Sequence, residues 1–122
     1  MFKILIIEDE ALSANRLAML IERYDKNIEV VAKIPSVRSA VRWFLVHPMP
    51  DLVFMDIHLE DGPSIAILNQ TLISAPVILT TAFEDELLKV YPVNYFACLP
   101  KPVSNDELTE VLDHFKRLIV ES

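Results

Sequence analysis

Leu-Val-Phe-Met-Asp, at residues 52–56, is a short apolar run that ends in a carboxylate. Pro48 and Pro50 precede this run and Gly62-Pro63 follows it, so turn-forming residues bound it on both sides. A continuous apolar run of this length is typical of a strand that is buried on both faces. Such strands occur in parallel sheets that helices cover on both sides. Residues 52–55 therefore predict a strand of an α/β protein.

Outward from this strand, strand-like and helix-like segments alternate along the chain. Further strands are predicted at residues 3–7, 28–34, 76–80 and 95–99. Helices are predicted at residues 14–24, 36–45, 64–72 and 84–91, and a last helix follows the capping box Ser104-Asn105-Asp106-Glu107. This alternation predicts a three-layer (βα)5 fold with a five-stranded parallel sheet, and we expect the flavodoxin-like strand order 2-1-3-4-5. Strand 28–34 carries Glu29 and Lys33, which favours an edge position.

The composition suits a folded protein and excludes several kinds of site. The chain has 122 residues, of which 52% are hydrophobic, and we expect one domain over residues 1–122. Its single glycine, Gly62, excludes a dinucleotide fingerprint, a P-loop and a nucleophile elbow, because each motif needs more than one glycine. His47, His58 and His114 lack the spacing of a zinc site.

Charge, cysteine content and hydropathy bear on partners and location. The formal net charge of −7 argues against direct binding of nucleic acid, which needs clustered Lys and Arg side chains. Cys98 is the single cysteine, so no intrachain disulfide can form, as suits a reducing compartment. No apolar run approaches the ~20 residues of a membrane span, and no signal-peptide cleavage site follows the first strand. We therefore expect a cytoplasmic protein without membrane contact.

Acidic residues and a lysine follow the predicted strands on the side where parallel sheets bind ligands. The first strand is followed by Glu8-Asp9, and the third ends at Asp56. In the expected order these strands are neighbours, so their carboxylates share one crevice. Such a cluster repels itself unless a cation is present, and carboxylate oxygens with open positions suit Mg²⁺. The fourth and fifth strands add Thr81 and Lys101, which suit phosphoryl transfer to a carboxylate nucleophile.

The same strand ends resemble those of a known family. The chain is similar over essentially its whole length to the receiver domains of bacterial two-component response regulators, the CheY-like superfamily. Its region around residues 80–83 and 94 is most similar to receivers attached to LytTR-type DNA-binding domains. The segments that carry the resemblance are Ile6-Ile7-Glu8-Asp9-Glu10, Phe54-Met55-Asp56-Ile57 with Gly62, Leu79-Thr80-Thr81-Ala82-Phe83, and Lys101-Pro102.

The resemblance implies a phospho-switch of a two-component system, not a conventional enzyme. Asp56 would be the phosphoacceptor, and a sensor histidine kinase would be the phosphoryl donor. Mg²⁺ would be bound directly by Asp9 and Asp56, through water by Glu8, and by the backbone carbonyl of His58.

The resemblance also assigns roles near the fourth and fifth strands. The hydroxyl of Thr81 would move toward the phosphoryl group, Lys101 would pair with that group, and the Lys101–Pro102 peptide would be cis. The surface of the fourth strand, fourth helix and fifth strand would switch on phosphorylation. That surface would serve a homodimer or another partner and control an output such as transcription regulation.

Two residues depart from the family pattern. Receivers usually have an aromatic residue three positions before the lysine, where this chain has Cys98. We hypothesise that the usual aromatic rotation is absent and that signalling depends on backbone shifts around residues 81–83. Pro100 removes a backbone donor and stiffens the loop that carries Lys101.

Two other functions remain open on the sequence. A phosphohydrolase of the haloacid-dehalogenase type also has a nucleophilic Asp after a strand. That class needs a second Asp two positions later, where this chain has His58. A receiver-like interaction module that never accepts phosphate would suit Cys98 and Pro100, although the acids and Lys101 are all present.

Overall fold

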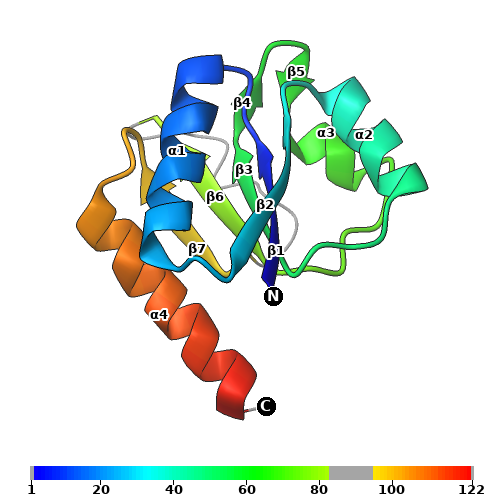
Figure 1. Ribbon diagram of the computed structural model, residues 1–122. Helices are drawn as coiled ribbons and strands as arrows, with labels where there is room; N and C mark the ends of the chain where they lie inside the picture. The colour runs from blue at the N-terminus through cyan, green and yellow to red at the C-terminus, as the bar shows by residue number, and fades with distance from the viewer. Residues whose placement is uncertain (1, 83–94, 122) are drawn as a thin grey trace.

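The computed structural model describes residues 2–82 and 95–121, and it shows a parallel sheet between two layers of helices (Figure 1). The sheet consists of β1 (Phe2–Ile7), β2 (Ile28–Ile34), β3 (Leu52–Asp56), β6 (Val77–Thr81) and β7 (Ala97–Pro100). The helices are α1 (Ala11–Tyr24), α2 (Val37–Val46), α3 (Ile65–Leu68) and α4 (Asn105–Glu121). The strand order is β2-β1-β3-β6-β7, and all pairings are parallel. The predicted fold class and order 2-1-3-4-5 are confirmed, with β6 and β7 as the fourth and fifth strands.

The inner strands are buried on both faces because successive side chains of a strand point to opposite layers. In β1, Ile4 and Ile6 belong to the core cluster that includes residues of α1 and α4. Leu5 and Ile7 belong to the opposite cluster, which includes residues of α2 and α3. All five residues of β3 are buried, and β3 is the middle strand of the sheet. The uninterrupted apolar run at residues 52–55 is explained by this position.

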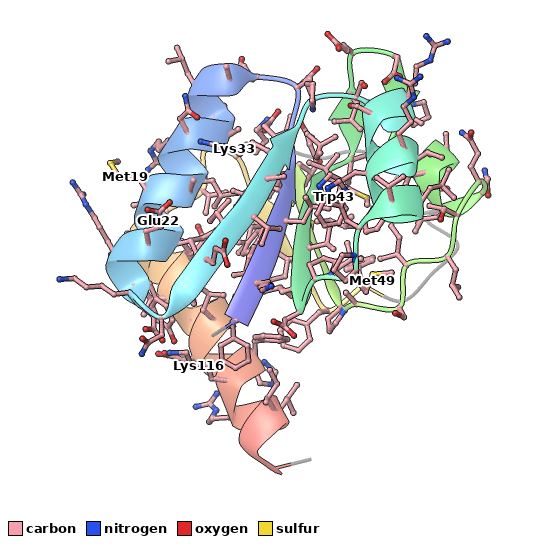
Figure 2. The ribbon with its side chains drawn as sticks, turned by 45° about the vertical axis from the view of Figure 1, so that its right-hand side comes forward. Met19, Glu22, Lys33, Trp43, Met49 and Lys116 are labelled. Atoms are coloured by element: carbon pink, nitrogen blue, oxygen red, sulfur yellow. The ribbon has the colours of Figure 1, made fainter. Side chains whose placement is uncertain are left out.

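Strand β2 lies at the edge of the sheet, as its two charged residues predicted. Glu29 and Lys33 are exposed. Lys33 lies beside α1, where its Nζ donates a hydrogen bond to Asn15 Oδ1 at 2.9 Å (Figure 2). The register with β1 shifts between Ile4 and Leu5, which leaves Val31 as an extra residue on β2. Such a bulge bends an edge strand and hinders pairing with another chain.

Two helix starts carry the caps that the sequence predicted. At α2, the hydroxyl oxygen of Ser36 accepts a hydrogen bond from the backbone N–H of Ser39 at 3.1 Å. At α4, the hydroxyl oxygen of Ser104 accepts from the backbone N–H of Glu107 at 3.1 Å and donates to the Glu107 carboxylate at 3.0 Å. These contacts satisfy backbone donors that a helix cannot bond internally.

The third helix is shorter than predicted. Helix α3 covers Ile65–Leu68, whereas the sequence suggested residues 64–72. Beyond it, the N–H groups of Gln70 and Thr71 both donate to the carbonyl of Ile67, so the chain tightens into a turn. Asn69 directly follows the helix and Thr71 comes two positions later, and both residue types are less favourable in helix interiors.

A short hairpin after β3 was not predicted. Strands β4 (His58–Leu59) and β5 (Gly62–Pro63) pair antiparallel directly after Asp56.

Strand β7 begins two residues later than the predicted segment 95–99, a difference within the usual uncertainty of strand ends.

Three further expectations concern single features. The Lys101–Pro102 peptide bond is cis, as the family resemblance implied. The predicted helix at residues 84–91 lies outside the described residues. Within the part of the chain that the structure describes, no helix has the length and apolar character needed to cross a membrane.

Candidate functional site

The parallel strands bring the predicted site residues to one edge of the sheet. Glu8 follows β1, and Asp56 is the last residue of the neighbouring strand β3. Thr81 ends β6, the next strand across the sheet, and Lys101 follows β7. This edge is where open α/β sheets bind their ligands.

Glu8, Asp9 and Asp56 form a carboxylate cluster, in which one oxygen of each side chain lies within 4.8 Å of the others. Glu8 and Asp56 are buried, whereas Asp9 is exposed. Hard oxygen donors with an open solvent side fit Mg²⁺, which retains several water ligands in proteins. The cluster includes no His or Cys among the described residues, so its donor set does not favour a softer metal.

The Asp9 carboxyl shows the electrostatic cost of this clustering. Partial desolvation by the surrounding protein raises the pKa of Asp9 above its usual value, and the hydrogen bond and negative charge of Glu8 raise it further. The positive charge of Lys101 opposes these effects without cancelling them. A cation among the three carboxylates would relieve this repulsion.

Lys101 lies between two of the acids. Its Nζ is 2.6 Å from Glu8 Oε1 and 3.0 Å from Asp56 Oδ2. Burial alone would lower the pKa of Lys101, but the hydrogen bonds and charges of these two carboxylates outweigh it, so the pKa is raised. The ammonium group is therefore held in its charged form. One ammonium charge cannot balance three carboxylates, and the site remains attractive to a cation.

Thr81 is connected to Lys101 through the backbone. The N–H of Lys101 donates to the carbonyl oxygen of Thr81 at 2.8 Å. The Thr81 hydroxyl donates to the carbonyl oxygen of Ala82 at 2.7 Å, and the side chain is buried. Its movement toward a phosphoryl group stays a prediction.

His58 contacts Asp56 through its backbone. Its N–H lies 3.3 Å from Asp56 Oδ1, to which it donates. The side chain is exposed. Pairing of β4 with β5 fixes this segment next to the acid cluster. The backbone carbonyl of His58 as a metal ligand stays a prediction.

A family model described as the response regulator receiver domain matches residues 4–113 of the chain. The chain belongs to this family. It is 29% identical over 120 residues to the sensory transduction protein LytT of Bacillus cereus, covering 96% of this chain and 48% of that protein. It is 28% identical over 123 residues to the transcriptional regulatory protein BtsR of Salmonella typhimurium, covering 96% of this chain and 49% of that protein. The chain therefore spans about half the length of these curated relatives.

The fold of this receiver domain is also found in solved structures. The response regulatory domain of protein mrkE from Klebsiella pneumoniae matches with a TM-score of 0.82 and 20% identity, over 98% of this chain and 99% of that chain. Receiver domains of response regulators are phospho-switches and not classical enzymes, so the family favours a switch over a phosphohydrolase. The name LytT accords with the likeness to LytTR-type regulators.

The receiver's usual aromatic position is held by Cys98 on β7. Cys98 is half-buried, pairs in register with Leu79 and packs against the core cluster on the α2 and α3 side. Phe96 packs in the opposite cluster, with its ring centroid 5.9 Å from that of Phe115. Phe96 therefore does not replace the aromatic residue that other receivers have at the position of Cys98.

Two residues near the site of this receiver were not predicted. Both oxygens of Asp61 accept backbone hydrogen bonds at the start of α2, from Val37 at 2.7 Å and Arg38 at 3.1 Å, and these bonds lower the pKa of Asp61. Arg16 of α1 donates from Nη1 to the carbonyl oxygen of Val103 at 2.6 Å. Their partners are backbone groups distant in sequence, and no side-chain pattern reveals such contacts.

Proposed function

We propose that residues 1–122 form one cytoplasmic receiver domain that accepts a phosphoryl group on Asp56 in the presence of Mg²⁺. The donor is a sensor histidine kinase, and the acyl phosphate is later lost to water. The contact of Lys101 Nζ with Glu8 and Asp56, within the carboxylate cluster, carries the proposal. These contacts support it, because the proposed acceptor, the proposed metal donors and a positive charge lie close together.

The proposed ligands of Mg²⁺ are Asp9 and Asp56 directly, Glu8 through water, and the backbone carbonyl of His58. When bound, Mg²⁺ supplies a Lewis-acid charge that stabilises the oxygens of the transferred group. The hydrogen bond and negative charge of Glu8 contribute to the raised pKa of Asp9, and they support this assignment because a bound cation would offset them.

In the proposed reaction, an Asp56 carboxylate oxygen attacks the phosphorus of a phosphohistidine on the kinase. The new O–P bond forms as the N–P bond breaks, and the bonding electrons return to the imidazole nitrogen. The His58 N–H orients the carboxylate through Oδ1, and the Lys101 ammonium contacts Oδ2. Lys101 neutralises charge on the transferring oxygens, which is the main catalytic contribution available to this kind of reaction.

After transfer, we propose that the Thr81 hydroxyl leaves the Ala82 carbonyl and donates to a phosphoryl oxygen. This change favours a second packing of the surface around β6 and β7. That surface is the proposed face for a homodimer or another partner. The fourth predicted helix, which would complete it, lies outside the described residues.

The proposed output is transcription regulation, in line with the printed name of BtsR, a transcriptional regulatory protein. With a formal charge of −7, the domain itself is not proposed to bind nucleic acid. Its action on transcription would therefore pass through a partner or an output domain.

Incubation with acetyl phosphate and Mg²⁺, followed by intact mass measurement, tests the proposal. We expect one phosphoryl adduct in the wild-type protein, and none with Asp56→Asn or after chelation of Mg²⁺. No adduct in the wild type would favour a phosphorylation-independent interaction module. An adduct that survives in Asp56→Asn would refute the acceptor assignment, and repeated turnover of a phosphomonoester would support a phosphohydrolase.

A further inference from the structure

Arg16 reaches from α1 to the segment that carries Lys101. Its Nη1 donates to the carbonyl oxygen of Val103 at 2.6 Å, although 87 positions of sequence separate the two residues. Val103 is buried and lies between β7 and α4. The proposed phosphoryl transfer does not itself involve this contact.

The backbone around Lys101 is anchored on both sides. The N–H of Lys101 itself bonds to the carbonyl of Thr81, which attaches the segment to β6. Two residues later, the carbonyl of Val103 is bonded by Arg16, which attaches the segment to α1. The lysine is thus held between two different elements of the fold.

Arg16 and Lys101 also line the same small pocket. Its walls include Glu8, which receives the shorter of the two Lys101 contacts. A lysine side chain has a flexible four-carbon stem, so the position of its backbone limits where the ammonium group can lie. A displacement of about 1 Å at a reacting centre can slow a reaction as much as ~10²-fold. A group that fixes the backbone next to Lys101 therefore matters for the reaction.

We propose that Arg16 is a positioning residue for Lys101. Through the Val103 carbonyl it holds the loop so that the Lys101 ammonium stays within hydrogen-bond distance of Glu8 and Asp56. This inference rests on the proposed function, because the position of Lys101 matters for the rate of phosphoryl transfer to Asp56. A purely structural tether between α1 and the loop would instead act independently of Lys101.

The substitution Arg16→Met tests the proposal, because it keeps an aliphatic stem and removes the guanidinium group. Arg23→Met, at the other end of α1, is the matched control. With acetyl phosphate and Mg²⁺, we expect Arg16→Met to gain its phosphoryl adduct roughly tenfold more slowly than the wild type. Arg23→Met should match the wild type, and Mg²⁺ should bind Arg16→Met at least as tightly as the other two proteins.

A double-mutant cycle separates positioning from stability. In a Lys101→Met background, Arg16→Met should cause no further slowing, because there is no ammonium left to position. Equal slowing in both backgrounds, or a wild-type rate in Arg16→Met alone, would overturn the proposal.

NMR of proteins with ¹³C-labelled lysine provides a second readout that needs no phosphoryl transfer. The Lys101 Cε signal should move toward that of an exposed lysine in Arg16→Met and stay unchanged in Arg23→Met. An unchanged signal in Arg16→Met would refute the positioning role. If the wild type gains no adduct, the proposed function fails, and the NMR comparison still decides whether Arg16 positions Lys101.

Discussion

In the part of the chain that the structure describes, Lys101 is the one side chain that contacts two of the clustered acids through a charged group. Its Nζ lies 2.6 Å from Glu8 and 3.0 Å from Asp56. These contacts give the lysine two functions in our account. It compensates part of the negative charge before the reaction, and it meets the phosphoryl oxygens during it. Removing the ammonium group should therefore slow phosphoryl transfer but should not weaken the binding of Mg²⁺.

We predict that Lys101→Met slows adduct formation from acetyl phosphate by roughly 10²-fold, the usual effect of removing one charge-stabilising donor. Mg²⁺ should bind at least as tightly, because the ammonium group no longer competes for the carboxylates. Titration with Mg²⁺ and the rate of adduct formation measure the two effects. Lys33→Met, on the edge strand, is the control and should change neither. A wild-type rate in Lys101→Met would remove the lysine from the mechanism.

Asp9 leads to a prediction about pH. Because its pKa is raised in the folded protein, the folded state binds this proton more tightly than the unfolded chain does. The stabilisation that comes from the protonated Asp9 carboxyl is present below its unfolded pKa of 3.8, and it is lost as pH rises through its folded pKa. Without metal, Asp9→Asn should therefore be more stable than the wild type at pH 7, by less than about 1 kcal/mol because the group is exposed.

Urea unfolding in the presence of a chelator tests this prediction about Asp9. The difference in the free energy of unfolding between the wild type and Asp9→Asn should shrink below pH 3.8. Saturating Mg²⁺ should reverse the order at neutral pH, because the wild type binds the ion better and binding stabilises the folded state. A wild-type protein that is more stable than Asp9→Asn with chelator at pH 7 would contradict the electrostatic argument.

The sequence was sufficient to predict which residues gather at the site. Asp56 ends one apolar strand, the Glu8-Asp9 pair directly follows its neighbour, and parallel strands end at the same edge of a sheet. Arg16 and Asp61 were not predictable in this way. Each bonds a backbone group whose position depends on the packing of complete elements.

At the scale of elements, the β4–β5 hairpin connects the site to α2. The hairpin begins two residues after Asp56, and its turn residue Asp61 accepts the N–H groups of Val37 and Arg38. A carboxylate at a helix N-terminus satisfies free donors and interacts favourably with the helix dipole. The segment that contains His58 is therefore attached to the start of α2.

We predict that Asp61→Ala lowers the melting temperature at pH 7, whereas Glu60→Ala, one position earlier and also exposed, has little effect. The pKa of Asp61 is lowered by its two backbone hydrogen bonds, so its contribution is present above the unfolded value of 3.8. That contribution is lost as pH falls through the folded pKa. Thermal melts at pH 7 and pH 2 should therefore show a difference that disappears in acid. Equal melting of both variants at pH 7 would show that the cap is not needed.

The elements themselves were predictable to different degrees. The starts of α2 and α4 were found from Ser36 and Ser104, because a capping side chain leaves a local signature. The two-residue strands of the hairpin are too short to show any periodicity. The predicted length of α3 was too great, because apolar residues continue in the sequence beyond the last residue of the helix.

For the whole molecule, the apolar runs decided the architecture. A strand buried on both faces requires helices on both sides, and the alternation along the chain supplies them. The burial of β3 follows from this arrangement, and so does the assignment of Ile4 and Leu5 to opposite core clusters. The bulge in β2 could not be predicted from the sequence, because a one-residue shift in strand register leaves no recognisable sequence pattern.

We predict that the stability of the molecule depends on this two-sided core. Leu5→Ala, in a side chain that is 0% exposed on β1, should lower the free energy of unfolding by about 2–5 kcal/mol. Leu12→Ala, the same change in a side chain that is 84% exposed, should change it by less than about 0.5 kcal/mol. Chemical denaturation of both variants measures the difference. Similar losses would show that β1 is not packed as described.

The central claim is that Asp56, and no other carboxylate, accepts the phosphoryl group. After reaction with acetyl phosphate and Mg²⁺, borohydride reduces an aspartyl phosphate to homoserine, and mass spectrometry of peptides then identifies the modified position. We predict homoserine at position 56 alone. Homoserine at position 9 or 61 with an unmodified Asp56 would contradict the account.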